Sequence, residues 1–315
     1  MMRFSLGTRL ATTATALGTA LGAVASMGTA TAAAAQPNGE WAPFTRCPVD
    51  AAAMLAADGL ARTPQCVVSS SASGSIKLGN TTVTTGRTNL QMGVIQNSDG
   101  TSSVVAPAGG ALVADSATVP GGLLGLMCPS NVPAITAICE QLSNSSLNKI
   151  TATVESVGAP YDFDQTAGIV TGRPIVAIPV RIHLENPFLG SKCYIGTQAN
   201  PVVLHPSNVQ YPEFGMSFFK GDGTVADDGE MSRINLTGAS QNDSTFAVPG
   251  ASGCGLSLGL IDAAVNAKTG LPSAAGKNSL TLNDTQTSLA GLNAPGTVAP
   301  DAGKRLSENW HSAVD

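Results

Sequence analysis

The chain has 315 residues, of which 43% are hydrophobic and 12% are charged, with 16 Lys and Arg against 21 Asp and Glu. So few basic residues leave no surface for gripping a phosphate backbone, which excludes a nucleic-acid-binding protein. Disordered chains combine a lower hydrophobic fraction with a higher net charge than this chain has, so the composition also disfavours disorder. With 35 Gly and 19 Pro, the composition indicates a turn-rich globular protein of one large or two small domains.

The N-terminus has the pattern of a secretory signal peptide. Arg3 and Arg9 precede an uncharged segment, residues 10–35, that is rich in Ala, Thr, Gly and Leu. The small residues before Gln36 predict cleavage there, so residues 1–35 are removed. An uncleaved membrane anchor is the alternative, but the many Thr and Gly dilute the apolar segment. No later hydrophobic run is long enough to span a bilayer. We therefore expect a secreted protein that is extracellular or associated with the cell surface.

All six cysteines follow the predicted cleavage site, and an even number in an exported chain predicts three disulfides. Proximity along the chain favours the pairs Cys47–Cys66, Cys128–Cys139 and Cys193–Cys254, although six cysteines allow many other connectivities. A zinc site is disfavoured because no C-x-x-C pair or nearby Cys/His cluster occurs. A catalytic thiol would need an unpaired cysteine, which the even number disfavours.

The first half of the mature chain divides into a leader and a run of strands. Residues 36–67 form a leader with a short helix over 51–58, clipped by its disulfide. From residue 69 to about 118, alternating and β-branched residues predict antiparallel hairpins, with strands at 75–79, 81–85, 90–96 and 101–106. A helix over 133–142 follows, with apolar residues on one face.

The second half returns to strands. These are predicted at 150–157, 174–184, 201–205, 214–219 and 244–248, and then at 279–282 and 287–289. Pro179 cannot donate a ladder hydrogen bond, so its strand is expected at an edge or a bulge. A helix over 256–268 ends at Gly270. Residues 291–315 are expected to be a flexible tail. The prediction is a single mainly β domain over 36–290, an antiparallel sandwich or barrel with two or three short helical inserts.

Two segments carry a resemblance to a group of known proteins. Residues 182–196 read IHLENPFLGSKCYIG, and residues 270–279 read GLPSAAGKNS. Both resemble segments of secreted proteins of actinobacteria whose function is uncharacterised, over roughly the second half of the chain. The resemblance implies an exported protein of a Gram-positive, high-GC bacterium. It implies no catalytic or ligand-binding residues.

Candidate metal ligands are sparse. His183 and Glu185 share one face of a predicted strand, and with His205 alongside they would make a two-histidine, one-carboxylate site. The alternative is a pair of ordinary hydrogen-bonded histidines. Four carboxylates on a Gly-rich loop, at Asp222, Asp227, Asp228 and Glu230, are candidate calcium ligands. The alternative there is a solvated hairpin turn, and no other cofactor is expected.

Catalytic motifs are absent from the sequence. Ser252 lies in a Gly-rich segment, but the segment does not form G-x-S-x-G, and a triad with His183 or His205 rests on no motif. No P-loop, dinucleotide fingerprint or H-E-x-x-H occurs. We therefore expect an exported non-catalytic protein, a binding or structural module with an unidentified partner in the cell envelope or in another copy of itself. A secreted hydrolase and an envelope β-pore are the alternatives.

Overall fold

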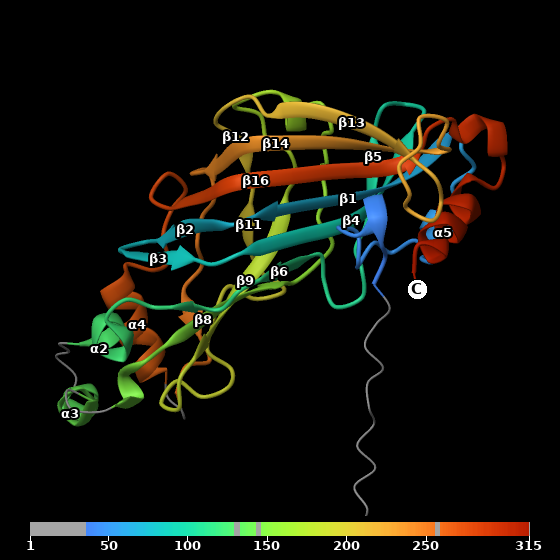
Figure 1. Cartoon of the computed structure of the whole chain (residues 1–315). Helices are drawn as coiled ribbons and strands as arrows, with labels where there is room; N and C mark the ends of the chain where they lie inside the picture. Colours follow the sequence, from blue (N-terminus) through green and yellow to red (C-terminus); the bar gives the residue numbers. More distant parts are fainter. Residues whose placement is uncertain (1–35, 129–132, 143–145, 256–258, 315) are drawn as a thin grey trace, which may run out of the picture. The chain divides into compact units, whose positions relative to one another are not determined.

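The computed structural model describes residues 36–128, 133–142, 146–255 and 259–314. The predicted signal peptide lies outside these residues. The described residues form one unit, in which two antiparallel β-sheets face each other (Figure 1). The two sheets remain separate, so the fold is sandwich-like and not a closed barrel, which confirms the predicted mainly β class and selects between its two forms.

The larger sheet has the strand order β12-β14-β16-β1-β4-β5 along its main path. Strand β13 pairs with β14, β2 pairs with β16 and β3, and β6 pairs with β4. The bounds are β1 Arg62–Ser71, β2 Ser73–Leu78, β3 Thr81–Thr85, β4 Thr88–Asn97, β5 Ser102–Val105, β6 Leu112–Ala114, β12 Ser207–Asn208, β13 Glu213–Phe219, β14 Met231–Asp243 and β16 Ser279–Leu292. The hairpin strands predicted from residue 75 to residue 106 are therefore confirmed, with shifts of a few residues at their ends.

Two long strands of this sheet were placed wrongly by the sequence patterns. Strand β1 is central, paired with β4 on one side and β16 on the other, although most of it was expected in the leader. Strand β14 runs over residues for which no strand was predicted, and the strand expected at 244–248 is not formed, apart from one isolated bridge at Val248. Both strands are rich in Ser, Thr, Asn or Gln, which obscures the apolar alternation.

Strand β16 joins the two short strands predicted near the C-terminus into one. Its pairing with β14 shifts register between Leu282 and Thr285, and Asp284 there has a positive φ of 50°. Such an extra residue is a β-bulge, and it reverses which side chains face the second sheet. Leu280 and Leu282 before the bulge, and Thr287 after it, consequently face the same side.

The smaller sheet has the order β15-β10-β9-β8-β7, with β11 also paired to β9. Its bounds are β7 Ala117–Thr118, β8 Thr151–Ser156, β9 Ile178–Glu185, β10 Tyr194–Ile195, β11 Val202–Leu204 and β15 Ala251–Ser252. Strand β9 is central, so the edge position predicted from Pro179 is wrong. Pro179 is the second residue of β9, where a proline interrupts the ladder least.

Helices α2, α3 and α4 gather at one end of the molecule and α5 lies at the other (Figure 1). The helices of the described ranges are η1 Gly39–Trp41, α1 Ala52–Leu55, α2 Gly122–Met127, α3 Pro133–Leu142, η2 Ser146–Asn148, η3 Ala167–Ile169, α4 Leu260–Thr269, η4 Pro295–Val298 and α5 Ala302–Ser312. Helix α3 has the predicted bounds, and α4 ends at Gly270 in the left-handed conformation, as predicted. None of the helices in the described ranges has the length and hydropathy needed to cross a membrane.

Apolar side chains gather in two cores, one on each face of the larger sheet. In β1, Val67 joins the core between the sheets, whereas Cys66 and Val68 join the core on the opposite face. This second core is closed by the leader, through Trp41 and Phe44, and by helix α5. Alternation along one strand thus supplies both cores.

The three predicted disulfides are confirmed. They join Cys47 to Cys66, Cys128 to Cys139 and Cys193 to Cys254. The first fastens the leader to the central strand β1, and the third joins the residue before β10 to the segment just after β15. Three disulfides indicate an oxidising, extracellular compartment.

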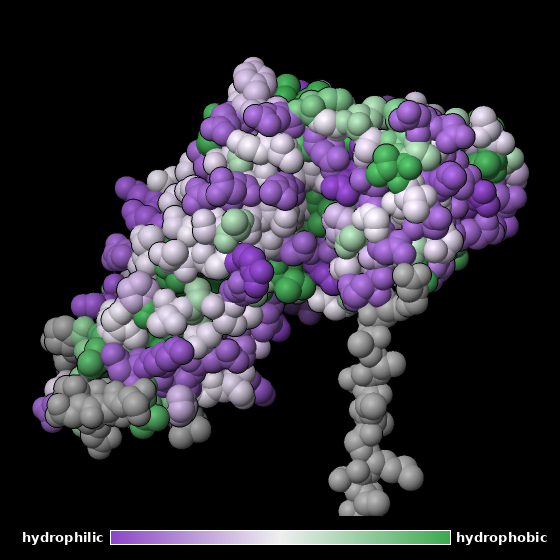
Figure 2. Space-filling view, viewed as in Figure 1, coloured by the Kyte–Doolittle hydropathy of each residue, from purple (hydrophilic) through white to green (hydrophobic). Residues whose placement is uncertain are grey.

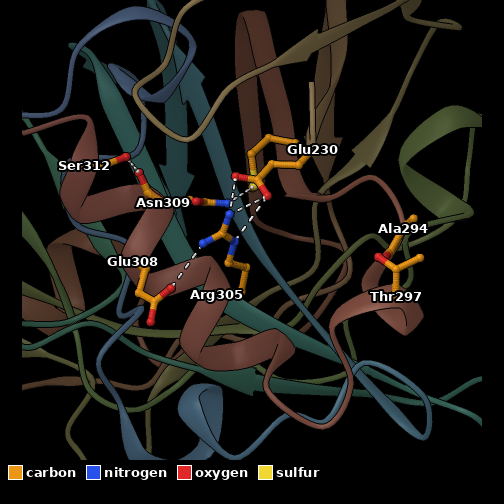
Figure 3. Close-up of polar contacts among 8 residues, drawn as sticks. Glu230, Ala294, Thr297, Arg305, Glu308, Asn309 and Ser312 are labelled. Atoms are coloured by element: carbon orange, nitrogen blue, oxygen red, sulfur yellow. Dashed lines mark hydrogen bonds and ion pairs between the residues drawn. The ribbon is translucent and has the colours of Figure 1, made fainter. Parts of the chain in front are cut away.

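The predicted flexible tail, residues 291–315, is instead a packed element. Helix α5 buries Ala302 and Leu306 against the second core. On its exposed side, the guanidinium of Arg305 donates to both carboxylate oxygens of Glu230, at 2.9 and 3.1 Å, and also lies 3.4 Å from Glu308 (Figure 3). Trp310 Nε1 donates to the Phe44 carbonyl at 2.9 Å. These contacts connect the C-terminal helix to both the leader and the larger sheet.

Candidate functional site

An apolar cavity of about 90 Å³ lies between the two sheets, and we call it the inner cavity. The larger sheet contributes Ile76, Val83 and Leu282 to its wall, and the smaller sheet contributes Val154 and Ile182. Each of these side chains follows the alternation of its strand, which points it toward the opposite sheet. The result is a concave surface made largely of hydrocarbon side chains.

Short side chains on the smaller sheet leave this space open. Ala117 and Ala152 are cross-strand partners in β7 and β8, and both line the inner cavity. A larger aliphatic side chain at either position would fill the gap, because protein cores are otherwise close-packed. An empty cavity of 90 Å³ costs about 2 kcal/mol of folding free energy. A ligand that occupied it would recover that loss.

One buried hydroxyl on the wall has no hydrogen-bond partner among the described residues. It is Oγ1 of Thr85, at the end of β3, and Thr85 lines the inner cavity. An unpaired buried polar group costs roughly 1–3 kcal/mol, so such groups call for a physical reason. A ligand with one hydrogen-bonding atom would pair with it.

Replacing Thr85 by valine should therefore stabilise the ligand-free protein by about 1 kcal/mol, since the substitution removes the unpaired hydroxyl and keeps the shape. Thr84→Val is the matched control, because Thr84 is the preceding residue of β3 and is exposed on the opposite face. Its effect should stay within about 0.5 kcal/mol. Urea unfolding of both variants measures the difference. A destabilised Thr85→Val protein would mean that the hydroxyl has a partner in solution.

Two further spaces continue from the inner cavity. A middle cavity of about 60 Å³ shares Leu112, Ile178 and Leu282 with the inner cavity. A wider cleft of about 610 Å³, which we call the mouth cleft, shares Phe163 and Leu236 with the middle cavity. The three spaces are therefore neighbours in one row: the inner cavity lies between the sheets, and the mouth cleft lies between the larger sheet and residues 163–173.

The mouth cleft differs from the inner cavity in carrying amide and guanidinium groups. Gln165 lies beside helix η3, and its Oε1 accepts hydrogen bonds from the amides of Gln65 and Gln96, at 3.1 and 3.2 Å. Arg173 binds Asp164 at 2.6 Å and remains largely exposed. The row of cavities thus changes from hydrocarbon at its inner end to amide and charged groups at its outer end.

The predicted histidine metal site is not assembled. His183 and Glu185 do share the outer face of β9, and Nδ1 of His183 lies 3.8 Å from Glu185 and 3.5 Å from Glu155. Tyr194 stacks on the His183 ring at 4.5 Å. His205 follows β11, and its backbone N–H donates to Asp243. Within the described ranges, no three His, Cys, Asp or Glu side chains are arranged to hold a metal.

Ser252 and His183, weighed above as members of a triad that rests on no motif, lie apart in the structure. Ser252 and His183 are both cross-strand partners of Tyr194, on its two opposite sides. Two strand spacings, about 10 Å, therefore separate them, which is far beyond hydrogen-bond reach. His205 follows β11, whose Leu204 is the cross-strand partner of Ile178, at the other end of β9 from His183, so His205 also lies away from Ser252.

The predicted calcium loop is the connection between β13 and β14, and its carboxylates do not gather. Asp222 accepts hydrogen bonds from the side chain and backbone N–H of Thr224, which lower the pKa of Asp222. Glu230 is engaged by Arg305. Asp222, Asp227, Asp228 and Glu230 therefore supply no group of three ligands in the structure.

Sequence patterns did not reveal the row of cavities, because its walls come from strands of two sheets. Comparison of the chain with protein-family models, with curated proteins and with solved structures finds no match.

Proposed function

We propose that the chain is an exported, non-catalytic binding protein that holds an apolar small molecule between its two sheets. The inner cavity is the observation that carries this proposal. A concave, largely apolar pocket with few polar groups is typical of ligand-binding sites. The unpaired hydroxyl of Thr85 supplies one polar contact, and the disulfides fit export to an oxidising compartment.

The chemistry of the wall favours binding over hydrolysis. The inner cavity is lined by aliphatic side chains, threonines and one carboxylate, Asp115. That carboxylate accepts the backbone N–H of Arg87 and lies 3.6 Å from its guanidinium. A hydrolytic site needs a nucleophile with a base in hydrogen-bond reach, and the lining holds neither histidine nor cysteine.

Benzene is a suitable first probe, because apolar cavities lined by aliphatic side chains bind it. Adding benzene to the mature protein should shift the methyl NMR signals of Val83 and Ile182, which line the inner cavity. Ala152→Leu should fill the space, raise the free energy of unfolding by about 1 kcal/mol and remove these shifts.

Ala108→Leu is the matched control, because Ala108 is exposed in a turn and lies outside all three spaces. This variant should keep both the benzene shifts and the stability of the natural protein. Benzene shifts that survive Ala152→Leu, or that fail to occur in the natural protein, would refute binding in the inner cavity.

A further inference from the structure

Strand β16 lines all three spaces in chain order. Leu280 lies at the inner cavity, Thr285 and Thr287 at the middle cavity, and Leu289 at the mouth cleft. The bulge at Asp284 makes this possible, because without it the two halves of the strand would face opposite sides. Nine residues of strand separate Leu280 from Leu289, so the row is about 30 Å long. Its shape is therefore elongated.

The middle cavity carries polar side chains, but they are bound to one another or to the backbone. Ser69 and Thr287 pair through their hydroxyls at 2.8 Å, and Thr285 donates to the Ala239 carbonyl. Gln241 donates to Asn208. Because these groups are already hydrogen-bonded, they offer few free donors or acceptors to a ligand in the middle cavity. Opposite them, Phe163 and Ile178 provide an apolar wall.

The mouth cleft combines hydrogen-bond donors with an apolar rim. Arg173 has five N–H donors, and its bond to Asp164 uses one terminal nitrogen. Ile169 and Phe214 line the same cleft and are 46% and 63% exposed, and Met216 beside them on β13 is 50% exposed. Figure 2 shows hydrophobic surface along the edge where Figure 1 places β13. Exposed apolar residues grouped at a cleft mark an interaction site.

We infer that the ligand is a single-chain amphiphile, whose alkyl chain lies in the row of cavities and whose oxygen-bearing head group stays in the mouth cleft near Arg173. This inference rests on the proposed function and specifies its ligand. The polarity of the row sets the direction, since the hydrocarbon end must face the inner cavity. The exposed rim of Ile169 and Phe214 is where the chain passes from water into the protein.

Fluorescence of cis-parinaric acid, an 18-carbon acid that emits strongly in apolar surroundings, provides the test. The mature protein should bind the acid at least tenfold more tightly than its methyl ester, because only the acid has a charged head. Arg173→Gln should weaken binding of the acid about tenfold and leave the ester unchanged. Equal affinities for acid and ester would overturn the placement of the head group.

A second variant tests the path of the chain. Gly168 lines the middle cavity, and a Cβ there would lie 3.6 Å from Leu236, with no backbone strain. Gly168→Leu should narrow the row and weaken binding of parinaric acid at least tenfold, while benzene still shifts the inner-cavity methyl signals. Gly158→Leu is the control, because Gly158 is exposed and also has an ordinary φ. An unchanged affinity in Gly168→Leu would overturn the proposed path.

The benzene measurement separates this inference from the proposed function. If benzene binds and parinaric acid does not, the cavity takes apolar molecules but the amphiphile is wrong. If neither binds, the proposed function fails as well. Displacement of parinaric acid by laurate would identify a carboxylate head, and displacement by lysophosphatidylcholine a phosphate head. Displacement by neither would overturn the amphiphile.

Discussion

Replacing Leu306 by alanine should lower the free energy of unfolding by about 3 kcal/mol. Its side chain is fully buried in the second core, with Trp41, Phe44 and Met54. Truncating such a residue removes its transfer free energy and leaves a cavity. Urea unfolding of the mature protein measures the loss, with the slope of the transition serving as a check on two-state behaviour.

Leu60→Ala is the matched control, since Leu60 is 73% exposed and the substitution is the same. It should change the stability by less than about 0.5 kcal/mol. Equal, small effects in the two variants would show that α5 adds nothing to the stability of the core. The prediction of a flexible tail would then hold. The contacts in the structure oppose that outcome, because the first and last described residues of the chain lie together. Pro37 and Val314 form a β-bridge, and Asn38 donates to the Ala313 carbonyl.

The burial of α5 was hard to predict for a definite reason. Its face toward the core carries small residues, including Ala302 and Gly303, with Leu306 as its one large aliphatic side chain. A Cβ added at Gly303 would collide with the backbone of α1, so the two helices approach closely. The helix has an apolar and a polar face but is polar on average, so a search for apolar segments passes over it.

Local patterns did predict the hairpins from β2 to β5, helix α3 and the three disulfides. Each of these depends on residues near one another in the chain, where alternation, helix signals or cysteine proximity suffice. Strand β14 was missed because its alternation is hidden by polar residues that face the middle cavity, such as Gln241. The same buried polar side chains that hide the strand pattern also make the lining of the middle cavity more polar than an ordinary core.

The candidate site depends on pairings that no local pattern contains. Ala117 and Ala152 create space only because β7 and β8 lie opposite the aliphatic side chains of β2 and β3. The order of the strands also keeps Ser252 and His183 from forming a triad, since Tyr194 lies between them. Sequence spacing could suggest each of these residues, but only the sheet topology shows which of them meet.

Removing the Cys193–Cys254 disulfide should cost about 4 kcal/mol, and removing Cys128–Cys139 about 3 kcal/mol. The difference comes from loop length, because the bridges close 61 and 11 residues, and a longer closed loop restricts the unfolded chain more. The comparison uses the paired alanine variants of each bridge and urea unfolding at one protein concentration.

The segment between Cys193 and Cys254 contributes strands to both sheets, which is why the bridge that closes it matters for the fold. It leaves the smaller sheet after β11, forms β12, β13 and β14 in the larger sheet, and returns at β15. Both cysteines are buried in the core between the sheets. The bridge therefore closes the loop of chain that leaves the smaller sheet, crosses to the larger sheet and returns. If removing Cys193–Cys254 lowers the free energy of unfolding no more than removing Cys128–Cys139 does, the longer loop does not restrict the unfolded chain more. The two sheets would then associate without help from the bridge.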